Sequence, residues 1–296
     1  MNHDILLKKI KTLDTRAIFL IERAIKNYTV TTSGMKLENN EGVPQGIPIS
    51  NLLAEIYVMQ LDHEINKTVF FYKRYVDDTI IITKHKYLDL QKLKHKCNEL
   101  KIELNNEKTK IVNIQNTISF LGYSLSKNKI SVSKKSCENH FKRINSIFKR
   151  YSINVKNQNN NEKTIIEELT MLLAGAFSEL KRYGWLPYYS MMTDIKILYK
   201  FDAFVIKKLK RYNYIHLQQN IPKMVRAYFA LRDGTWNKYA FSFDNKTIAE
   251  KIEILQRRNL YPSDGRNLTE YEIDIIYKRF IKGKTQMLDF DLGRRY

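Results

Sequence analysis

The sequence predicts an α+β protein in which helices and strands are mixed up to about residue 130 and helices follow. Two observations support this prediction. Apolar residues recur with helical spacing over 4–27 and 48–65, and the strand-like runs 70–75 and 79–83 are separated by only three residues. Apolar residues also make up 43% of the 296 residues while glycine and proline are scarce, which excludes a mainly disordered or collagen-like chain.

The first elements are predicted from spacing and from breaks. Residues 4–27 form one predicted helix, and 29–42 form a strand pair or extended loop, because a β-branched start runs into Ser-Gly and Asn-Asn-Glu-Gly. A second helix is predicted over 48–65. The runs 70–75 and 79–83 predict a tight hairpin of buried strands, with both helices packed on one face of its small antiparallel sheet.

The later elements follow from the same signals, and the pattern changes to helices near residue 130. In chain order we expect a basic helix over 87–101, strands over 108–114 and 119–125, a basic helix over 134–151, a polar linker over 154–163, and helices over 164–216 and 246–282.

Charge restricts the class of partner. The 51 Lys and Arg residues outnumber the 31 Asp and Glu residues, which gives a net charge of +20. Such an excess favours a polyanion, most often nucleic acid, over the alternative of an anionic membrane surface. The sequence has no apolar run of membrane-spanning length and no signal peptide. Cys97 and Cys137 make neither a disulfide scaffold nor a zinc pattern, so we expect a reduced, cytoplasmic protein without a membrane partner.

Asp77 and Asp78 form a carboxylate pair between two apolar runs. Adjacent carboxylates repel each other unless a cation lies between them or water reaches both. A divalent metal with oxygen ligands suits the first case, and phosphoryl-transfer enzymes use two such ions about 4 Å apart. The alternative is an ordinary polar turn, because Asp is common in turns.

Two further segments contain candidate site residues. The Gly- and Pro-punctuated stretch 41–50 leads into a helix, so its backbone could approach a ligand closely and Gln45 could hydrogen-bond a base or a sugar. A lysine near the carboxylate tip could protonate or neutralise a leaving pyrophosphate, and Lys108, in the stretch 104–109, is the candidate. The alternatives are an ordinary loop and a surface lysine among many basic residues.

Taken in order, four segments resemble the motifs of reverse transcriptases, in the style of bacterial non-LTR enzymes such as retron, group II intron and antiphage-defence proteins. The matching segments are Val43–Ser50 for motif B (PQGxxxS), Tyr75-Val76-Asp77-Asp78 for motif C (YxDD), Leu104–Thr109 for motif D (LNxxKT) and Phe120–Tyr123 for the FLGY segment before the thumb. The resemblance covers about residues 1–150.

The resemblance implies a fold. Residues 1–130 would be part of a right-handed polymerase palm, 131–163 the start of the thumb and a polar linker, and 164–296 a helical C-terminal region. The thumb would be all-helical, and its basic helix would hold an RNA template or an RNA/DNA duplex by its phosphates.

The resemblance also implies roles for the candidate residues. Asp77 and Asp78 would bind the Mg²⁺ ions of a two-metal site, and Lys108 would act near the pyrophosphate. Gln45 and Gly46 would border the incoming dNTP and the template. The predicted enzyme is an RNA-directed DNA polymerase, a nucleotidyltransferase, and a noncoding RNA is a further implied partner.

One expected motif is missing. Asn2–Ile10 resembles the segment that follows motif A, whose strand carries the third metal-binding aspartate, and neither Asp4 nor Asp14 can replace it because both follow that strand. We therefore expect activity only if an upstream segment or a separate N-terminal half supplies motif A. The alternative is a polymerase-derived protein that binds nucleic acid without chemistry. Retron enzymes often carry a VTG motif near the thumb, and intron proteins usually add a DNA-binding or endonuclease region. The sequence contains neither a VTG motif nor an endonuclease-like Cys/His cluster, so antiphage defence is the expected setting.

Overall fold

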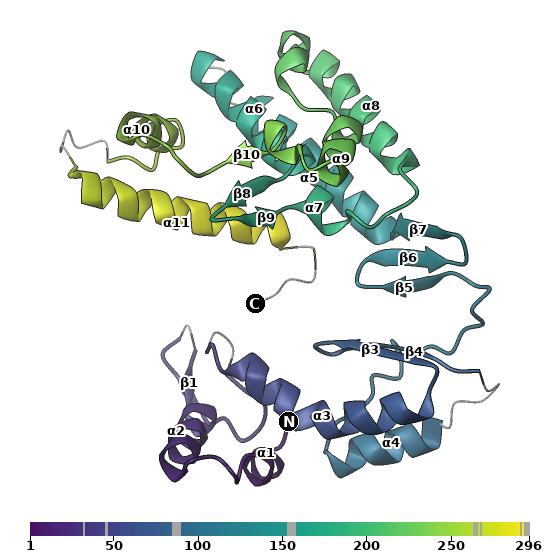
Figure 1. Ribbon diagram of the computed structural model, residues 1–296. Helices are drawn as coiled ribbons and strands as arrows, with labels where there is room; N and C mark the ends of the chain where they lie inside the picture. The colour runs from purple at the N-terminus through teal and green to yellow at the C-terminus, as the bar shows by residue number, and fades with distance from the viewer. Residues whose placement is uncertain are drawn as a thin grey trace. The chain divides into compact units, whose positions relative to one another are not determined.

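The computed structural model describes residues 1–31, 33–44, 47–84, 90–152, 158–262, 266, 268–290 and 292 (Figure 1). The chain divides into two compact units, Met1–Val112 and a second unit that begins at Asn113. Each unit has a hydrophobic core of its own. Within the described residues, no helix is both long enough and apolar enough to cross a membrane.

The first unit is drawn in purple and blue in Figure 1. Its elements are, in chain order, α1 (His3–Lys9), α2 (Thr15–Lys26), β1 (Thr29–Val30), β2 (Lys36–Leu37), α3 (Ser50–Thr68), β3 (Phe71–Tyr75), β4 (Asp78–Ile82) and α4 (Leu90–Glu99). The predicted strand pair within 29–42 is confirmed by the antiparallel pairing of β1 with β2.

The single helix predicted over 4–27 is wrong, because α1 and α2 are separate helices. Asp14 begins the second one: its Oδ1 accepts the backbone N–H of Arg16 at 2.9 Å and that of Ala17 at 3.3 Å. α1 and α2 bury their apolar sides against each other and against α3, where Leu6 and Tyr57 are almost fully buried. α3 in turn packs against β3, as predicted for the helix over 48–65.

The second unit is larger. Its elements are β5 (Ile118–Phe120), β6 (Tyr123–Ser126), β7 (Lys129–Val132), α5 (Lys134–Ser152), α6 (Gln158–Leu173), β8 (Ala176–Ser178), β9 (Lys181–Tyr183), α7 (Trp185–Tyr188), α8 (Lys196–Arg211), the 3₁₀ helix η1 (Ile215–Asn220), α9 (Met224–Arg232), the 3₁₀ helix η2 (Trp236–Lys238), β10 (Phe241–Ser242), α10 (Ile248–Gln256) and α11 (Glu270–Asp289). α5 confirms the basic helix predicted over 134–151.

The prediction that only helices follow residue 130 is wrong. β8, β9 and β10 form a sheet in the order β10-β8-β9, and β10 lies parallel to β8. Strands of two or three residues are too short to show alternating hydrophobicity in the sequence. The α+β class therefore extends through the second unit.

Two other predicted elements also differ from the structure. Residues 108–114 form no strand, and Ile111 and Ile114 are 65% and 58% exposed, because an apolar run needs a neighbouring strand to pair with. The linker predicted over 154–163 is helical from Gln158 onward, where α6 begins. The first part of that prediction, 154–157, lies outside the described residues.

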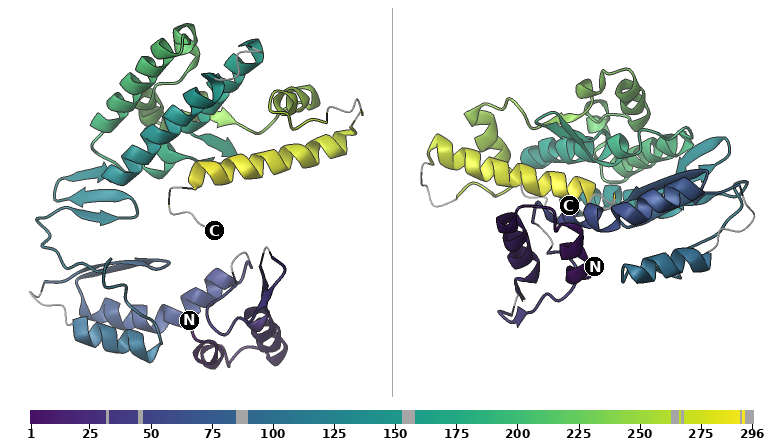
Figure 2. Two further views of the ribbon diagram at one scale, coloured as in Figure 1. Left: turned by 180° about the vertical axis from the view of Figure 1, so that it is seen from behind. Right: turned by 60° about the horizontal axis from the view of Figure 1, so that its bottom comes forward.

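The main core of the second unit lies among α5, α6, α8 and α9. Its largest buried side chains include Phe148, Trp185, Phe201 and Tyr228. α11, yellow in Figure 2, packs against α10 and β9 and closes a second cluster around Tyr277.

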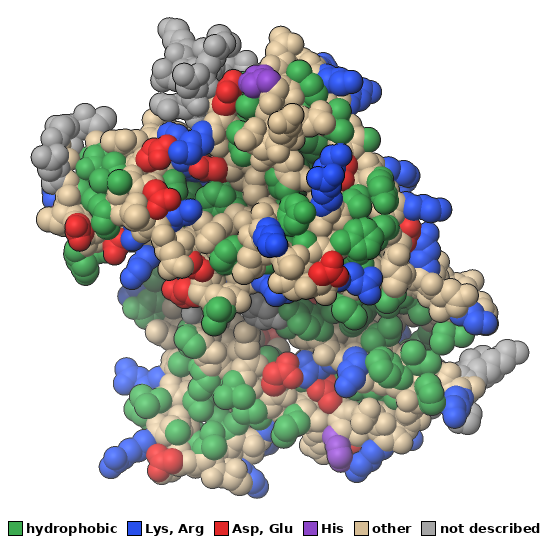
Figure 3. All heavy atoms as spheres, turned by 45° about the horizontal axis from the view of Figure 1, so that its top comes forward, with side chains coloured by type: hydrophobic (Ala, Val, Ile, Leu, Met, Phe, Trp, Pro, Cys, Tyr) green, Lys and Arg blue, Asp and Glu red, His purple; other side chains and the backbone are tan. Residues whose placement is uncertain are grey.

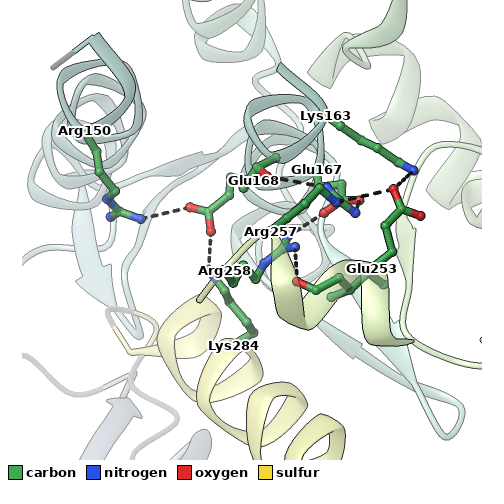
Figure 4. Close-up of polar contacts among 10 residues, drawn as sticks. Arg150, Lys163, Glu167, Glu168, Glu253, Arg257, Arg258 and Lys284 are labelled. Carbon is green, nitrogen blue, oxygen red and sulfur yellow. Dashed lines mark hydrogen bonds and ion pairs between the residues drawn. The ribbon is translucent and has the colours of Figure 1, made fainter. Parts of the chain in front are cut away.

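Two adjacent glutamates on α6, Glu167 and Glu168, connect the helices of this unit (Figure 4). Their partners are Arg257 and Arg258, at 2.7 and 2.5 Å, for the first, and Arg150, at 3.2 Å, and Lys284 for the second. Burial alone would raise the pKa of Glu167, but its two guanidinium partners lower it below the usual value. The paired charges hold α5, α10 and α11 to α6.

Candidate active site

The β3–β4 hairpin carries the predicted carboxylate pair at its tip (Figure 1). The strands pair antiparallel as far as Tyr75↔Asp78, which leaves Val76 and Asp77 as a two-residue loop. The predicted tight hairpin is confirmed, although Asp78 is the first residue of β4 rather than part of the loop. Val76 has a φ of 55°, a left-handed conformation that is unfavourable for a β-branched residue.

Asp77 and Asp78 are both exposed, and neither carboxylate has a hydrogen bond or an ion pair to any residue that the structure describes. The prediction of a buried strand pair is wrong, because every residue of β3 and β4 is at least partly exposed and Phe71 is 40% exposed. A two-stranded sheet leaves one of its faces uncovered. Water therefore reaches both carboxylates, which keeps their oxygens available to a cation.

Arg74, on the strand that leads to the tip, connects the hairpin to α3. Its Nε and Nη2 donate to Asp62 at 2.9 and 2.6 Å, and its Nη1 and Nη2 donate to Glu55 at 3.1 and 2.6 Å. Nη1 also donates to the carbonyl oxygen of Val76 at 2.8 Å. The guanidinium of Arg74 thus links α3 to the backbone of the loop that carries Asp77.

Tyr72 completes this network, because its hydroxyl donates to Asp62 Oδ1 at 2.5 Å. Burial, followed by this hydrogen bond, raises the pKa of Tyr72. The hydrogen bonds to Asp62 are the main reason that the pKa of Arg74 is raised as well. Arg74 therefore remains a cation, and Tyr72 a neutral donor, over the physiological pH range.

Sequence reasoning missed Arg74 and its two partners. Glu55 and Asp62 are seven residues apart on α3, and Tyr72 and Arg74 are two apart on β3, so each pair lies on one face of its element. These spacings were visible in the sequence. The sequence could not predict that the face of α3 with Glu55 and Asp62 packs on the face of β3 with Arg74.

The segment resembling motif B connects to the same helix. Gln45 and Gly46, predicted to border the dNTP and the template, lie outside the described residues. Beside them, Ser50 is buried as the first residue of α3, and its hydroxyl donates to the carbonyl oxygen of Pro44 at 2.6 Å. The end of this segment is therefore anchored to the helix that also holds Arg74.

Lys108 lies in a separate turn of the first unit and is exposed. The Asn105 side chain shapes this turn, since its Oδ1 accepts the backbone N–H groups of Glu107 and Lys108 at 3.1 Å each. Among the described residues, no direct hydrogen bond or ion pair joins Lys108 to Asp77 or Asp78.

The donor chemistry of the tip suits Mg²⁺, which prefers carboxylate oxygens and water. The described residues contain no group of three His, Cys, Asp or Glu side chains that could hold a metal ion. A metal site that included Asp77 and Asp78 would therefore need at least one further ligand.

A second candidate surface lies in the other unit, where α5 and α8 run side by side. We call Lys142, Lys149, Lys200, Lys207 and Arg211 the α5–α8 basic face; all five are exposed, and α5 packs against α8. Figure 3 shows the exposed Lys and Arg side chains of one face of the chain in blue.

The charges of the α5–α8 basic face lie close enough to affect one another. Burial, and then the like charges of Arg211, Lys149 and Lys207, lower the pKa of Lys208, whose ammonium donates to Asn145 on α5. Asp202, the acidic residue of α8, instead accepts the Met224 N–H at 2.7 Å and so caps α9. The surface can contact phosphates of a polyanion.

Comparison with known proteins bears on the first of these sites. Residues 1–125 match the family model described as reverse transcriptase (RNA-dependent DNA polymerase). The chain is also 26% identical over 165 residues to Protein YkfC of Escherichia coli (strain K12), a match that covers 42% of this chain and 43% of that protein. The matched part thus spans less than half of that relative. The segment that contains the carboxylate tip is similar to a reverse transcriptase domain.

Proposed function

We propose that this chain belongs to an RNA-directed DNA polymerase and that Asp77 and Asp78 are its metal ligands. The observation that carries this proposal is the pair of exposed carboxylates without partners among the described residues, one on the two-residue loop and one at the start of β4, inside the segment that matches the family model. An ordinary polar turn would not need two adjacent exposed carboxylates at a strained loop whose backbone a guanidinium holds.

The residues would divide the chemistry as follows. Mg²⁺ bound by Asp77 and Asp78 would lower the pKa of the primer 3′-hydroxyl and neutralise the triphosphate. Lys108 would offset the charge of the departing pyrophosphate, and Gln45 and Gly46 would border the dNTP and the template. Two carboxylates do not fix both ions, so we place a third on a further segment of the same protein or on a partner.

The second unit would bind the nucleic acid. The α5–α8 basic face suits an RNA template or an RNA/DNA duplex, because contacts between Lys or Arg and phosphates do not depend on base sequence. Arg143 is a poor candidate for such contacts. Its guanidinium donates to the carbonyl oxygens of Met287 and Leu288, at 2.7 and 3.3 Å, and so holds α11.

The basic face also favours a second candidate function, a nucleic-acid-binding protein without polymerase chemistry. Primer extension on an RNA template with Mg²⁺ separates the two. The 296-residue chain is assayed alone and together with the segment encoded upstream of it or with its genomic neighbour. We expect duplex binding in both assays and extension only in the second. Binding without extension in either assay would favour the second candidate.

The biological setting that we propose is antiphage defence. Cells that carry the gene and its neighbours should give fewer phage plaques than cells that carry the Asp77→Asn form. Equal plaque counts over a broad phage panel would contradict this setting and would leave the enzymatic proposal to the extension assay.

A further inference from the structure

Arg74 uses its whole hydrogen-bonding capacity. A guanidinium has five N–H groups. One N–H of Arg74 goes to Asp62 from Nε, two go from Nη2 to Asp62 and Glu55, and two go from Nη1 to Glu55 and the Val76 carbonyl oxygen. The side chain is only 13% exposed. A guanidinium saturated in this way has a fixed orientation.

One consequence concerns the loop. Val76 is left-handed at φ 55°, and its carbonyl oxygen is the atom that Arg74 holds at 2.8 Å. A strained backbone persists only where surrounding contacts determine it. The hydrogen bond to Val76 is such a contact, and the next residue along the chain is Asp77.

The other consequence concerns charge. Arg74 Nη1 lies 2.8 Å from the carbonyl oxygen of Val76, the residue before Asp77. The register pairs Arg74 with Thr79 and Tyr75 with Asp78, so Asp78 lies on the other face of the hairpin, and Asp77 is the exposed carboxylate beside the guanidinium. A free guanidinium there would pair with a carboxylate and compete with a metal ion. Glu55 and Asp62 occupy it instead, at 2.6 Å each from Nη2.

We propose that Glu55, Asp62 and Arg74 act as a clamp that positions Asp77 and keeps the arginine from pairing with the Asp77 carboxylate. This inference rests on the proposed function, since it assigns the clamp to the same site. Arg74 is a positioning residue, because it touches the loop backbone and not the reacting atoms. A merely structural role would be to fasten β3 to α3 without any effect on the tip.

Hydrogen–deuterium exchange of the full chain tests the positioning of the loop. Arg74→Lys keeps the charge but cannot reach both acids and the Val76 carbonyl oxygen. We expect exchange at residues 75–79 to rise roughly tenfold while α6, in the other unit, is unchanged. Arg16→Lys, an exposed arginine of α2, is the matched control and should change nothing. Unchanged exchange at 75–79 in Arg74→Lys would overturn the proposal.

Tb³⁺ luminescence excited through tyrosine tests the control of charge, because Tyr75 adjoins the loop. The signal lost in Asp77→Asn defines the hairpin site. Glu55→Ala removes both acceptor oxygens that Glu55 offers to Arg74 and is expected to fold, since the Glu55 side chain is 57% exposed. The released N–H groups should turn to the Asp77 carboxylate, and the Tb³⁺ midpoint should rise roughly 10-fold to 100-fold. A purely structural clamp predicts an unchanged midpoint, and that result would contradict the proposal.

The two readouts do not depend on polymerase activity. If the assembled wild-type protein fails to extend a primer, the proposed function is wrong. Hydrogen exchange and Tb³⁺ binding still test whether Arg74 positions the loop. If it extends, Arg74→Lys should lower kcat and leave KM for the dNTP and duplex affinity nearly unchanged. Loss of duplex affinity instead would assign Arg74 to binding and overturn the positioning role.

Discussion

At the scale of single residues, His140 shows how strongly one buried side chain depends on its surroundings. It is 1% exposed, neither ring nitrogen has a hydrogen-bond partner, and its ring packs against those of Trp185 and Phe201 at centroid distances of 4.8 and 4.7 Å. Burial, assisted by the charge of Arg143, lowers the pKa of His140 to about 3. The imidazole is therefore a neutral part of the core.

This histidine predicts that the second unit loses stability in acid. Below pH about 6.5 this histidine is protonated in the unfolded chain but stays neutral in the folded protein. The free energy of unfolding therefore falls as pH falls, by about 1.4 kcal/mol per pH unit until the folded pKa is approached. His140→Phe should flatten the profile between pH 6.5 and 4. Denaturant unfolding followed by the fluorescence of the neighbouring Trp185 measures it, with His63→Gln on an exposed site as the control. A slope unchanged in His140→Phe would contradict this account.

At the scale of elements, the turn between β5 and β6 docks on α7. The Tyr123 hydroxyl donates to the carbonyl oxygen of Tyr188 at 2.6 Å, and the Tyr188 hydroxyl donates to that of Leu121 at 3.0 Å. Gly122 lies at φ 77°, where a Cβ would approach the hydroxyl oxygen of buried Tyr189 to 2.3 Å. The glycine of the FLGY segment is thus required by packing.

Gly122→Ala should destabilise the second unit by about 1–3 kcal/mol, because the added methyl group would force the buried side chain of Tyr189 to shift. Gly234→Ala is the matched control. It has nearly the same φ, 78°, but nothing lies within 4 Å of an added Cβ, so it carries the backbone strain without the clash. Thermal unfolding of both variants measures the difference. Equal losses in the two would show that the contact with Tyr189 is unimportant.

The elements also show what the sequence could predict. The hairpin and α3 were predictable because two strand-like runs separated by a few residues, and apolar spacing over a long helix, are local signals. Asp14 is a recognisable helix cap that the periodicity of 4–27 obscured. β10 pairs with β8 across more than sixty residues, and Arg74 meets Glu55 across 19, so both depend on tertiary packing that no local pattern encodes.

For the whole molecule, part of the net charge of +20 lies on the exposed side chains of the α5–α8 basic face. Charge reversal at Lys142 and Lys207 should weaken binding to all duplex sequences alike. Each phosphate contact contributes about 0.9 to the slope of log K against log salt on B-form DNA, so losing two should make the slope shallower by about 1.8, with the same trend for duplexes that contain RNA.

Fluorescence anisotropy at several salt concentrations measures these slopes. Lys278→Glu on α11 makes the same charge change at an exposed lysine away from this face and should leave the slope nearly unchanged. An equal effect of both changes would mean that net charge, and not this face, governs binding.

We propose that the tip of the β3–β4 hairpin is the metal-binding site of a polymerase, and the Asp77→Asn variant distinguishes this role from that of a structural turn. In the assembled protein that extends a primer on RNA, we predict that this change lowers the extension rate by roughly 100-fold or more, because it removes a metal ligand. Duplex affinity, measured on the same samples, should stay within about twofold, since no phosphate contact is lost. Extension that survives Asp77→Asn at the wild-type rate would contradict the assignment of the site.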